Sequence, residues 1–345
     1  MPEVKIKQTA EAAEGAAVVQ VAGDYCAGLS IDQTKEIARE VMRTEYGILF
    51  DDALQTFQRR ATKLTDDIIG KVESTNPLLK QRFKEPSIQL TLNAVLKEYG
   101  KTGDPDLGEG LVDLMIEKLT FKDGCIQSHI IDEAIALLPK LNKDHLVFLA
   151  MLYRFRNTYN PNLTDLPKFN SYYQQWISLI QPITNIGEDF IKYLKFLRCV
   201  QDMSMTKYYK PYEEIIQINY AGLFNKGFNP HEIEPDIMTK LHDAGLIIRC
   251  LHNRTKLQIN THNESTLNER LNNFQESDKI QILKIFTDNI IPSTEIKDYL
   301  KSQDKRWNDI LTFLDNKEFN CYELSSVGKY LGKKYFDKIE KTIIH

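Results

Sequence analysis

Cys250 and His252 form the closest pairing of a cysteine with a histidine in the sequence. A β-strand would place both side chains on one face, because side chains alternate along a strand with a period of two. Two ligands fall short of the four that structural zinc takes in proteins. We therefore interpret the pair as a half-buried thiol beside a turn histidine, and we expect no metal and no other cofactor.

Acidic residues occur as neighbours at Asp51-Asp52, at Asp66-Asp67, and at Glu232 and Glu234 with Asp236. Adjacent residues on a helix point about 100° apart, so the first two pairs do not converge on one ion or substrate. Motifs of phosphate-binding loops, serine hydrolases and zinc proteases do not occur in the sequence. We predict no catalytic residues. An enzyme that uses acids dispersed along the chain, such as a nuclease, stays as an alternative.

Four cations, Lys240, Arg249, Arg254 and Lys256, accompany a predicted β-hairpin. Residues 235–244 have helical spacing, and two β-prone runs, 246–251 and 256–260, flank a turn. A helix followed by a two-stranded ribbon is the layout of a winged-helix unit, here about residues 231–262. Arg and Lys on such ribbons commonly contact phosphates, so a nucleic-acid-binding regulator is one alternative. Acids on the same helix dilute the charge and favour protein docking or a structural role.

The whole chain has 345 residues, 44 Lys and Arg against 48 Asp and Glu, and 42% hydrophobic residues. This balance is ordinary for a globular protein and argues against one that coats nucleic acid or anionic membranes. Five scattered cysteines are typical of reduced thiols in a cytosol. Neither a signal peptide nor an apolar run of about 20 residues is present. We predict a soluble, cytoplasmic protein with no membrane partner.

The N-terminal segment contains a β-prone run around Val18, Val19 and Val21, bounded by Gly15 and Gly23. A single strand cannot satisfy its own backbone hydrogen-bonding groups. We predict that it pairs with the same segment of other subunits. An unordered leader, or a strand added to the chain's own C-terminal half, are the alternatives.

A seam of apolar residues follows, with alternating spacings of four and three, at Phe50, Leu54, Phe57, Ala61, Leu64 and Ile68. This is the period of a coiled coil, and we predict that the seam and the N-terminal strand together form an oligomer interface. The alternative is a helix packed inside its own monomer.

The remaining chain alternates helical patterns with short breaks, including predicted helices at 87–99, 107–119, 129–138, 143–156, 172–181 and 187–201. The fold class is therefore mainly α, with a short N-terminal β segment and a small hairpin in the C-terminal half. We predict domains at 1–75, 76–160 and 168–345, separated near the Pro-containing stretch 157–168. Small residues at 323–332 favour close packing between helices.

Three short patterns resemble an uncharacterised bacterial family: Gln8 with Gly15–Asp24 and Gly28-Leu29-Ser30, then Asp132–Leu141, and finally Leu324–Gly332. Similar N-terminal pieces occur at the front of some bacterial defence effectors. The resemblance implies a bacterial, cytosolic and mainly helical protein with a place in phage defence, and it assigns no catalytic residues. We expect a non-enzymatic, oligomeric scaffold or sensor that docks a partner.

Overall fold

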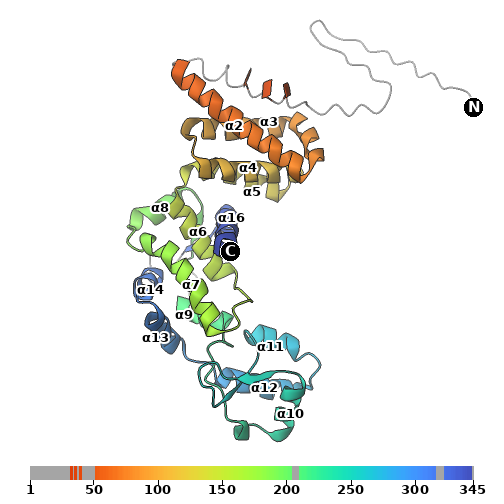
Figure 1. The fold of residues 1–345 in the computed structure, drawn as a ribbon, viewed down its shortest axis with the longest axis vertical. Coiled ribbons are helices and arrows are strands. Elements are labelled where there is room, and N and C mark those ends of the chain that lie inside the picture. The colour runs from red at the N-terminus through yellow and green to blue at the C-terminus, as the bar shows by residue number, and fades with distance from the viewer. Residues whose placement is uncertain are drawn as a thin grey trace, which may run out of the picture. The chain divides into compact units, whose positions relative to one another are not determined.

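The computed structural model describes residues 51–203, 210–315 and 322–343, with helical residues 32–33, 35–36 and 39–40. These parts are mainly helical, with short antiparallel strands in two small sheets, which confirms the predicted fold class. The chain forms two compact units, Met1–Pro139 and Lys140–His345 (Figure 1). The predicted strand with Val18, Val19 and Val21, and residue Phe50, lie outside the described residues.

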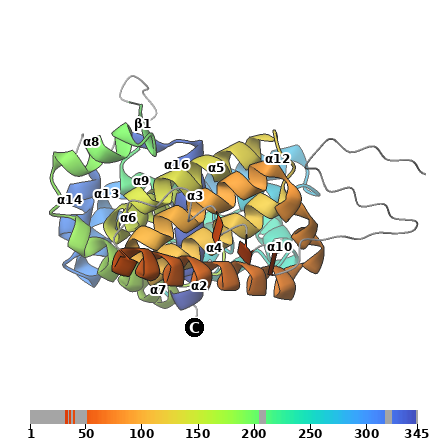
Figure 2. The ribbon, with the colours of Figure 1, turned by 90° about the horizontal axis from the view of Figure 1, so that it is seen from above.

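The first unit is a set of packed helices. They are α2 (Asp51–Thr75), η1 (Pro77–Lys84), α3 (Pro86–Thr102), α4 (Pro105–Thr120) and α5 (Ile126–Leu137), and η2 (Leu138–Lys140) follows. Figure 2 shows α2 lying along α3 and α4, which it contacts. The predicted boundary at residue 75 therefore falls inside this unit.

The apolar seam on α2 is covered within the first unit. Phe57, Leu64 and Ile68 are 5%, 1% and 1% exposed, and the ring of Phe57 lies against Gly100 of α3. Leu54 is half-buried. The seam residues therefore contact helices of their own chain, as the alternative interpretation expected. Oligomerisation itself stays a prediction.

The second unit is built around α6 (Lys143–Asn157). The other helices that the structure describes in this unit are α7 (Leu166–Ile180), η3 (Gln181–Ile183), α8 (Glu188–Phe196), α9 (Tyr212–Asn219), η4 (Pro230–Glu232), α10 (Pro235–Asp243), α11 (Glu264–Arg270), α12 (Glu276–Asp288), α13 (Ser293–Gln303), α14 (Trp307–Asp315) and α16 (Ser326–Ile343). The predicted linker 157–168 lies within it, where the Asn160 N–H donates to the Tyr220 hydroxyl.

Helix α16 packs closely through two glycines, Gly332 against α6 and Gly328 against Cys199, the residue before Val200. A Cβ atom on Gly332 would lie 2.6 Å from the Leu149 carbonyl oxygen, and one on Gly328 would overlap the Cys199 carbonyl. Both positions therefore exclude any side chain. The expected close packing of the small residues at 323–332 is confirmed.

Strand β1 (Val200–Asp202) pairs antiparallel with β4 (Tyr322–Leu324), in the register Val200 with Leu324. The prediction of one helix over residues 187–201 is wrong at its end. Helix α8 stops at Phe196, and Arg198 has a φ of 56°, which no helix can continue.

A separate apolar core organises residues 220–291, which we call the hairpin unit. Strand β2 (Ile247–Arg249) pairs antiparallel with β3 (Leu257–Ile259), as predicted. The core side chains are Ala221, Phe228, Ile237, Leu241, Leu246, Ile259, Leu267, Leu271, Ile282 and Phe286, all at most 2% exposed. Helices α10, α11 and α12 thus share one core with the hairpin.

None of the helices in the described ranges is long and apolar enough to cross a lipid bilayer.

Replacing Gly328 with alanine should destabilise the second unit by about 2 kcal/mol, because the new methyl group would displace α16 from the β1 segment. Urea unfolding followed by circular dichroism measures this loss. Lys329→Ala, at an exposed position of the same helix, is the control and should change the free energy of unfolding by less than about 0.5 kcal/mol. Equal stability of Gly328→Ala and wild type would contradict the close packing.

Candidate functional site

Lys240, one of the four cations predicted to accompany the hairpin, forms ion pairs with two carboxylates. Its Nζ lies 2.6 Å from Asp236 Oδ2 and 2.9 Å from Asp278 Oδ2. Hydrogen bonds to these carboxylates raise the pKa of Lys240. Since Asp278 belongs to α12, Lys240 joins α10 to α12, and its charge is matched inside the hairpin unit.

Arg249, Arg254 and Lys256 come together on the hairpin. Arg249 ends β2, and its Nη1 lies 3.5 Å from the Arg254 carbonyl oxygen. Both arginines are exposed, while Lys256 is half-buried with its Nζ 3.5 Å from the Gly227 carbonyl. Within the described ranges, none of the three makes an ion pair with a carboxylate.

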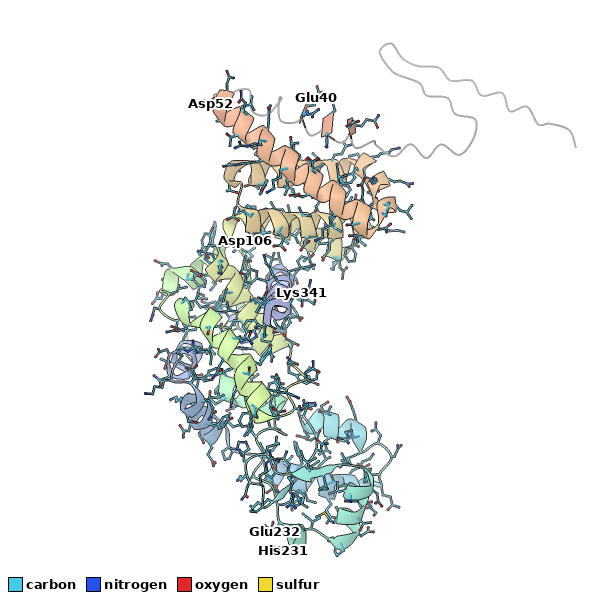
Figure 3. The ribbon with its side chains drawn as sticks, in the orientation of Figure 1. Glu40, Asp52, Asp106, His231, Glu232 and Lys341 are labelled. Carbon is cyan, nitrogen blue, oxygen red and sulfur yellow. The ribbon has the colours of Figure 1, made fainter. Side chains whose placement is uncertain are left out.

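Glu232 is the acid whose pKa responds to Lys256. Figure 3 labels it beside His231, in the turn η4 before α10. Two hydrogen bonds from Asn229 lower the pKa of Glu232 most, and the charge of Lys256 lowers it less. Glu232 is thus held mainly by Asn229, which it caps.

The turn of the hairpin is anchored by His252 and Cys250. His252 Nε2 lies 2.8 Å from the Leu223 carbonyl, and its ring contacts Phe224 and Tyr299. The buried Cys250 thiol donates to the Asn225 carbonyl at 3.3 Å. Both side chains are engaged in contacts within the second unit. The histidine lies at the turn as interpreted, but the thiol, expected to be half-buried, is fully buried, because the loop at Asn225 covers it.

Gln258 holds the hairpin against the segment before it, and the sequence did not single it out. It is 1% exposed in the middle of β3, donates from Nε2 to the Gly222 carbonyl, and accepts from the Leu251 N–H. In the sequence, Gln258 stands between the apolar Leu257 and Ile259. In an alternating strand this pattern predicts a solvent-facing side chain, so it gave no signal of burial. The structure instead buries the Gln258 side chain, which reaches the Gly222 carbonyl.

Arg154 is the most deeply buried cation among the described residues of the second unit, and it was not singled out from the sequence. It is 1% exposed. It donates to the hydroxyls of Tyr172 (2.7 Å), Tyr220 (2.6 Å) and Tyr173 (3.3 Å), and to the Thr158 carbonyl. Its position three and four residues after the apolar Met151 and Ala150 was the signal of burial.

A tyrosine hydroxyl connects Arg154 to the negative charge of Glu340. The Tyr172 hydroxyl donates to Glu340 Oε1 of α16 at 2.6 Å, and Trp176 Nε1 donates to the same oxygen at 3.3 Å. Burial raises the pKa of Tyr172 above its ordinary range, so this hydroxyl keeps its proton. The guanidinium, hydroxyl and carboxylate therefore link α6, α7 and α16.

A second ionic cluster joins α9, α13 and α14. Lys297 Nζ lies 2.6 Å from Asp315 Oδ2 and 3.2 Å from Glu213 Oε1. The other oxygens of both carboxylates, Glu213 Oε2 and Asp315 Oδ1, are buried with no hydrogen-bond partner in the described part of the chain. Lys297 thus holds two acids that only the tertiary fold brings together.

A small pocket lies beside Tyr212. It is lined by Phe148, Met151, Leu152, Phe155, Arg156, Lys210, Tyr212, Ile215 and Leu314. Arg156 also donates to the Tyr322 carbonyl of β4. The lining is apolar apart from the cations Arg156 and Lys210 and the hydroxyl of Tyr212.

The paired acids do not gather into a site. Asp66 pairs with Lys35 at 2.7 Å, and Asp51, Asp52 and Asp67 are exposed on α2. Across residues 51–203, 210–315 and 322–343, no three His, Cys, Asp or Glu side chains come close enough to share a metal ion.

Fold and contacts together define a mainly helical protein of two units, the second of which carries a small hairpin unit. A family model with the description ":-like" matches residues 28–343, and the chain belongs to this family. The description states no activity. The match contains two of the three patterns behind the resemblance, 132–141 and 324–332.

No curated protein and no solved structure matches the chain.

Burial lowers the pKa of His252 below its ordinary value of 6.5, and burial does the same for His145 and His262. As pH falls below about 6.5, the unfolded chain binds protons that the folded chain resists, so the free energy of unfolding should decrease. His252→Gln keeps an N–H donor but cannot titrate, and should flatten this dependence.

Urea unfolding between pH 8 and pH 5 measures the effect. His145 and His262 should retain part of the slope in the His252→Gln variant. If the free energy of unfolding changes with pH identically in this variant and in wild type, the folded hairpin does not lower the pKa of His252.

Proposed function

We propose that this protein is a non-enzymatic helical scaffold that assembles with copies of itself and docks a protein partner through the hairpin unit. The observation that carries the proposal is the hairpin itself. Gln258 and His252 fix it with buried or half-buried hydrogen bonds, yet Arg249 and Arg254 stay exposed and make no ion pair with any carboxylate that the structure describes. A rigid ribbon with unmatched charge is preorganised for docking, because little conformational entropy is lost on binding.

Charge balance supports a protein partner over nucleic acid. Residues 220–291 contain eight Lys and Arg against nine Asp and Glu. Lys240 is already matched by two carboxylates. A local basic ribbon on a nearly neutral unit suits an acidic protein segment better than the extended phosphate backbone of a duplex.

Buried ionisable groups support the scaffold role because each joins helices. Arg154 links α6 to α7 and, through Tyr172, to α16. Lys297 links α9, α13 and α14. In the first unit, Lys118 of α4 lies 2.7 Å from Asp132 of α5 and 2.6 Å from the Ser128 hydroxyl.

Self-assembly is supported by the sequence before Asp32. The seam residues Phe57, Leu64 and Ile68 are covered within the first unit, so the predicted interface rests on Val18, Val19 and Val21. These β-branched residues form a strand-prone run whose backbone groups need a partner.

Replacing Val18, Val19 and Val21 with serine in the full chain should lower the mass measured by light scattering at tens of micromolar, because serine removes the β-branched contacts of the strand. Lys5→Ala/Lys7→Ala, changed outside the β-prone run, is the control and should keep the mass of wild type. A deletion of residues 1–75 would not test self-assembly, because it would also remove α2 from the core of the first unit. A monomeric wild-type chain would overturn the assembly.

A nucleic-acid-binding regulator is the second candidate function, favoured by the exposed Arg249 and Arg254. On this hypothesis, Arg249→Ala/Arg254→Ala weakens binding to a labelled duplex or single strand about tenfold at low salt, since each arginine contacts phosphate. Fluorescence anisotropy is the measurement. Lys329→Ala/Lys341→Ala, which removes two exposed charges from α16, should bind like wild type. No binding by wild type at low salt excludes this function.

The setting we propose is the bacterial cytoplasm, with a role in phage defence. Its support is the resemblance of the N-terminal pattern to the front of some bacterial defence effectors.

A further inference from the structure

One edge of the hairpin carries backbone groups that β3 does not use. The Cys250 N–H donates to the Lys256 carbonyl, so these two residues form a bonded pair of the ladder. Because bonded and non-bonded pairs alternate along an antiparallel ladder, Ile248 also bonds to β3. The N–H and C=O groups of Ile247 and Arg249 therefore point to the outer side of β2, where no backbone group of the described ranges bonds to them.

The other edge of the same sheet is already occupied. Phe228 exchanges two backbone hydrogen bonds with Leu257 of β3. Among the residues that the structure describes, the outer side of β2 is thus the place where a further strand can join. Gln258 and His252 hold the hairpin, so an incoming strand meets an edge that is already in place.

Arginines stand at both ends of the β2 edge. Arg249 ends the strand, and its guanidinium donates to the Arg254 carbonyl in the turn. At the other end, Arg270 of α11 donates from Nη2 to the carbonyl of Gly245, two residues before β2 begins. All three arginines are exposed, and none of them makes an ion pair with a carboxylate in the described part of the chain.

The spacing of these charges indicates which partner would fit. Gly245 and Arg249 are four residues apart, which corresponds to about 13 Å along a strand. Two acids four residues apart on an incoming strand span the same length and point to the same face. One acid can then reach Arg270 and the other can reach Arg249. Between them the strand passes the half-buried Ile247, beside which a β-branched residue packs well.

We propose that the outer edge of β2 binds an extended acidic segment of a partner protein as a third strand, with two carboxylates on the flanking arginines. Strand addition satisfies backbone groups of both partners, and the opposite charges select the segment. This inference rests on the proposed function, because it names the mode in which the hairpin unit docks its protein partner. A nucleic acid would contact the arginines but has no strand to bond the Ile247 and Arg249 amides.

Hydrogen exchange of single amides in the full chain tests strand addition. The probe is the synthetic peptide Gly-Ser-Glu-Val-Thr-Val-Glu-Ser-Gly, whose glutamates have the spacing of the arginines. At saturating peptide, the Ile247 and Arg249 amides should exchange at least tenfold more slowly than in the free protein. The Cys250 amide already donates to β3 and should be unchanged. The same peptide, N-methylated at both valines and the threonine, lacks the backbone donors of a strand and should protect neither amide.

Two substitutions at Arg249 separate its backbone from its charge. Arg249→Ala removes the guanidinium and should weaken peptide binding about threefold at low salt. Arg249→Pro removes the guanidinium and also the outward N–H, and should weaken binding about tenfold further. Fluorescence anisotropy of the labelled peptide measures both affinities. Equal affinities of the two variants, with the Cys250 amide protected in each, overturn strand addition.

The remaining outcomes distinguish this inference from the proposed function. Peptide binding that depends on the arginines but leaves the Ile247 and Arg249 amides in fast exchange overturns strand addition and leaves docking by charge. Amides already protected in the free protein, or no peptide binding at low salt, also overturn strand addition, while light scattering still tests self-assembly. Protection by the peptide in a monomeric wild type supports strand addition although self-assembly fails. Equal protection by a peptide with glutamine in place of both glutamates overturns the acidic partner.

Discussion

The second unit depends on how a fully buried guanidinium is satisfied. Arg154 cannot lose its charge, so the fold must supply acceptors for its N–H groups or incur a large desolvation cost. Three tyrosine hydroxyls and the Thr158 carbonyl supply them, and Tyr172 passes the charge on to Glu340. Because these acceptors come from different segments, α6, α7, α16 and the start of the hairpin unit must all be in place together.

The position of the hairpin unit follows from the same network. Tyr220, which begins this unit, accepts from Arg154 and from the Asn160 N–H. Phe224 packs on Phe169 of α7 and on Tyr299 of α13, and His252 contacts Phe224 and Tyr299. The hairpin is therefore fixed to the helices at its turn, while the side chains of Arg249 and Arg254 are exposed.

Cations in this protein divide into those that hold helices together and those that remain available. Arg154, Lys118, Lys240 and Lys297 each contact groups on at least two helices or segments. Arg249 and Arg254 lie on the hairpin, where the Arg249 guanidinium donates to the backbone carbonyl of Arg254. The same residue types thus serve as internal links or as surface charge, according to whether the fold brings acceptors to them.

The sequence by itself located the helices between residues 87 and 196 and the helix at 235–244. It also determined the turn at 252–255 and the pairing of 246–251 with 256–260, because these depend on neighbours within a few residues. It also identified an apolar face on α2, since periodicity shows which face is apolar. Only the tertiary structure decided what covers that face, and it placed α3 and α4 there. Likewise, Lys240 meets Asp278 across 38 residues, and Arg154 meets Tyr220 across 66. Charges and buried donors find their partners through packing between distant segments, which local spacing does not encode.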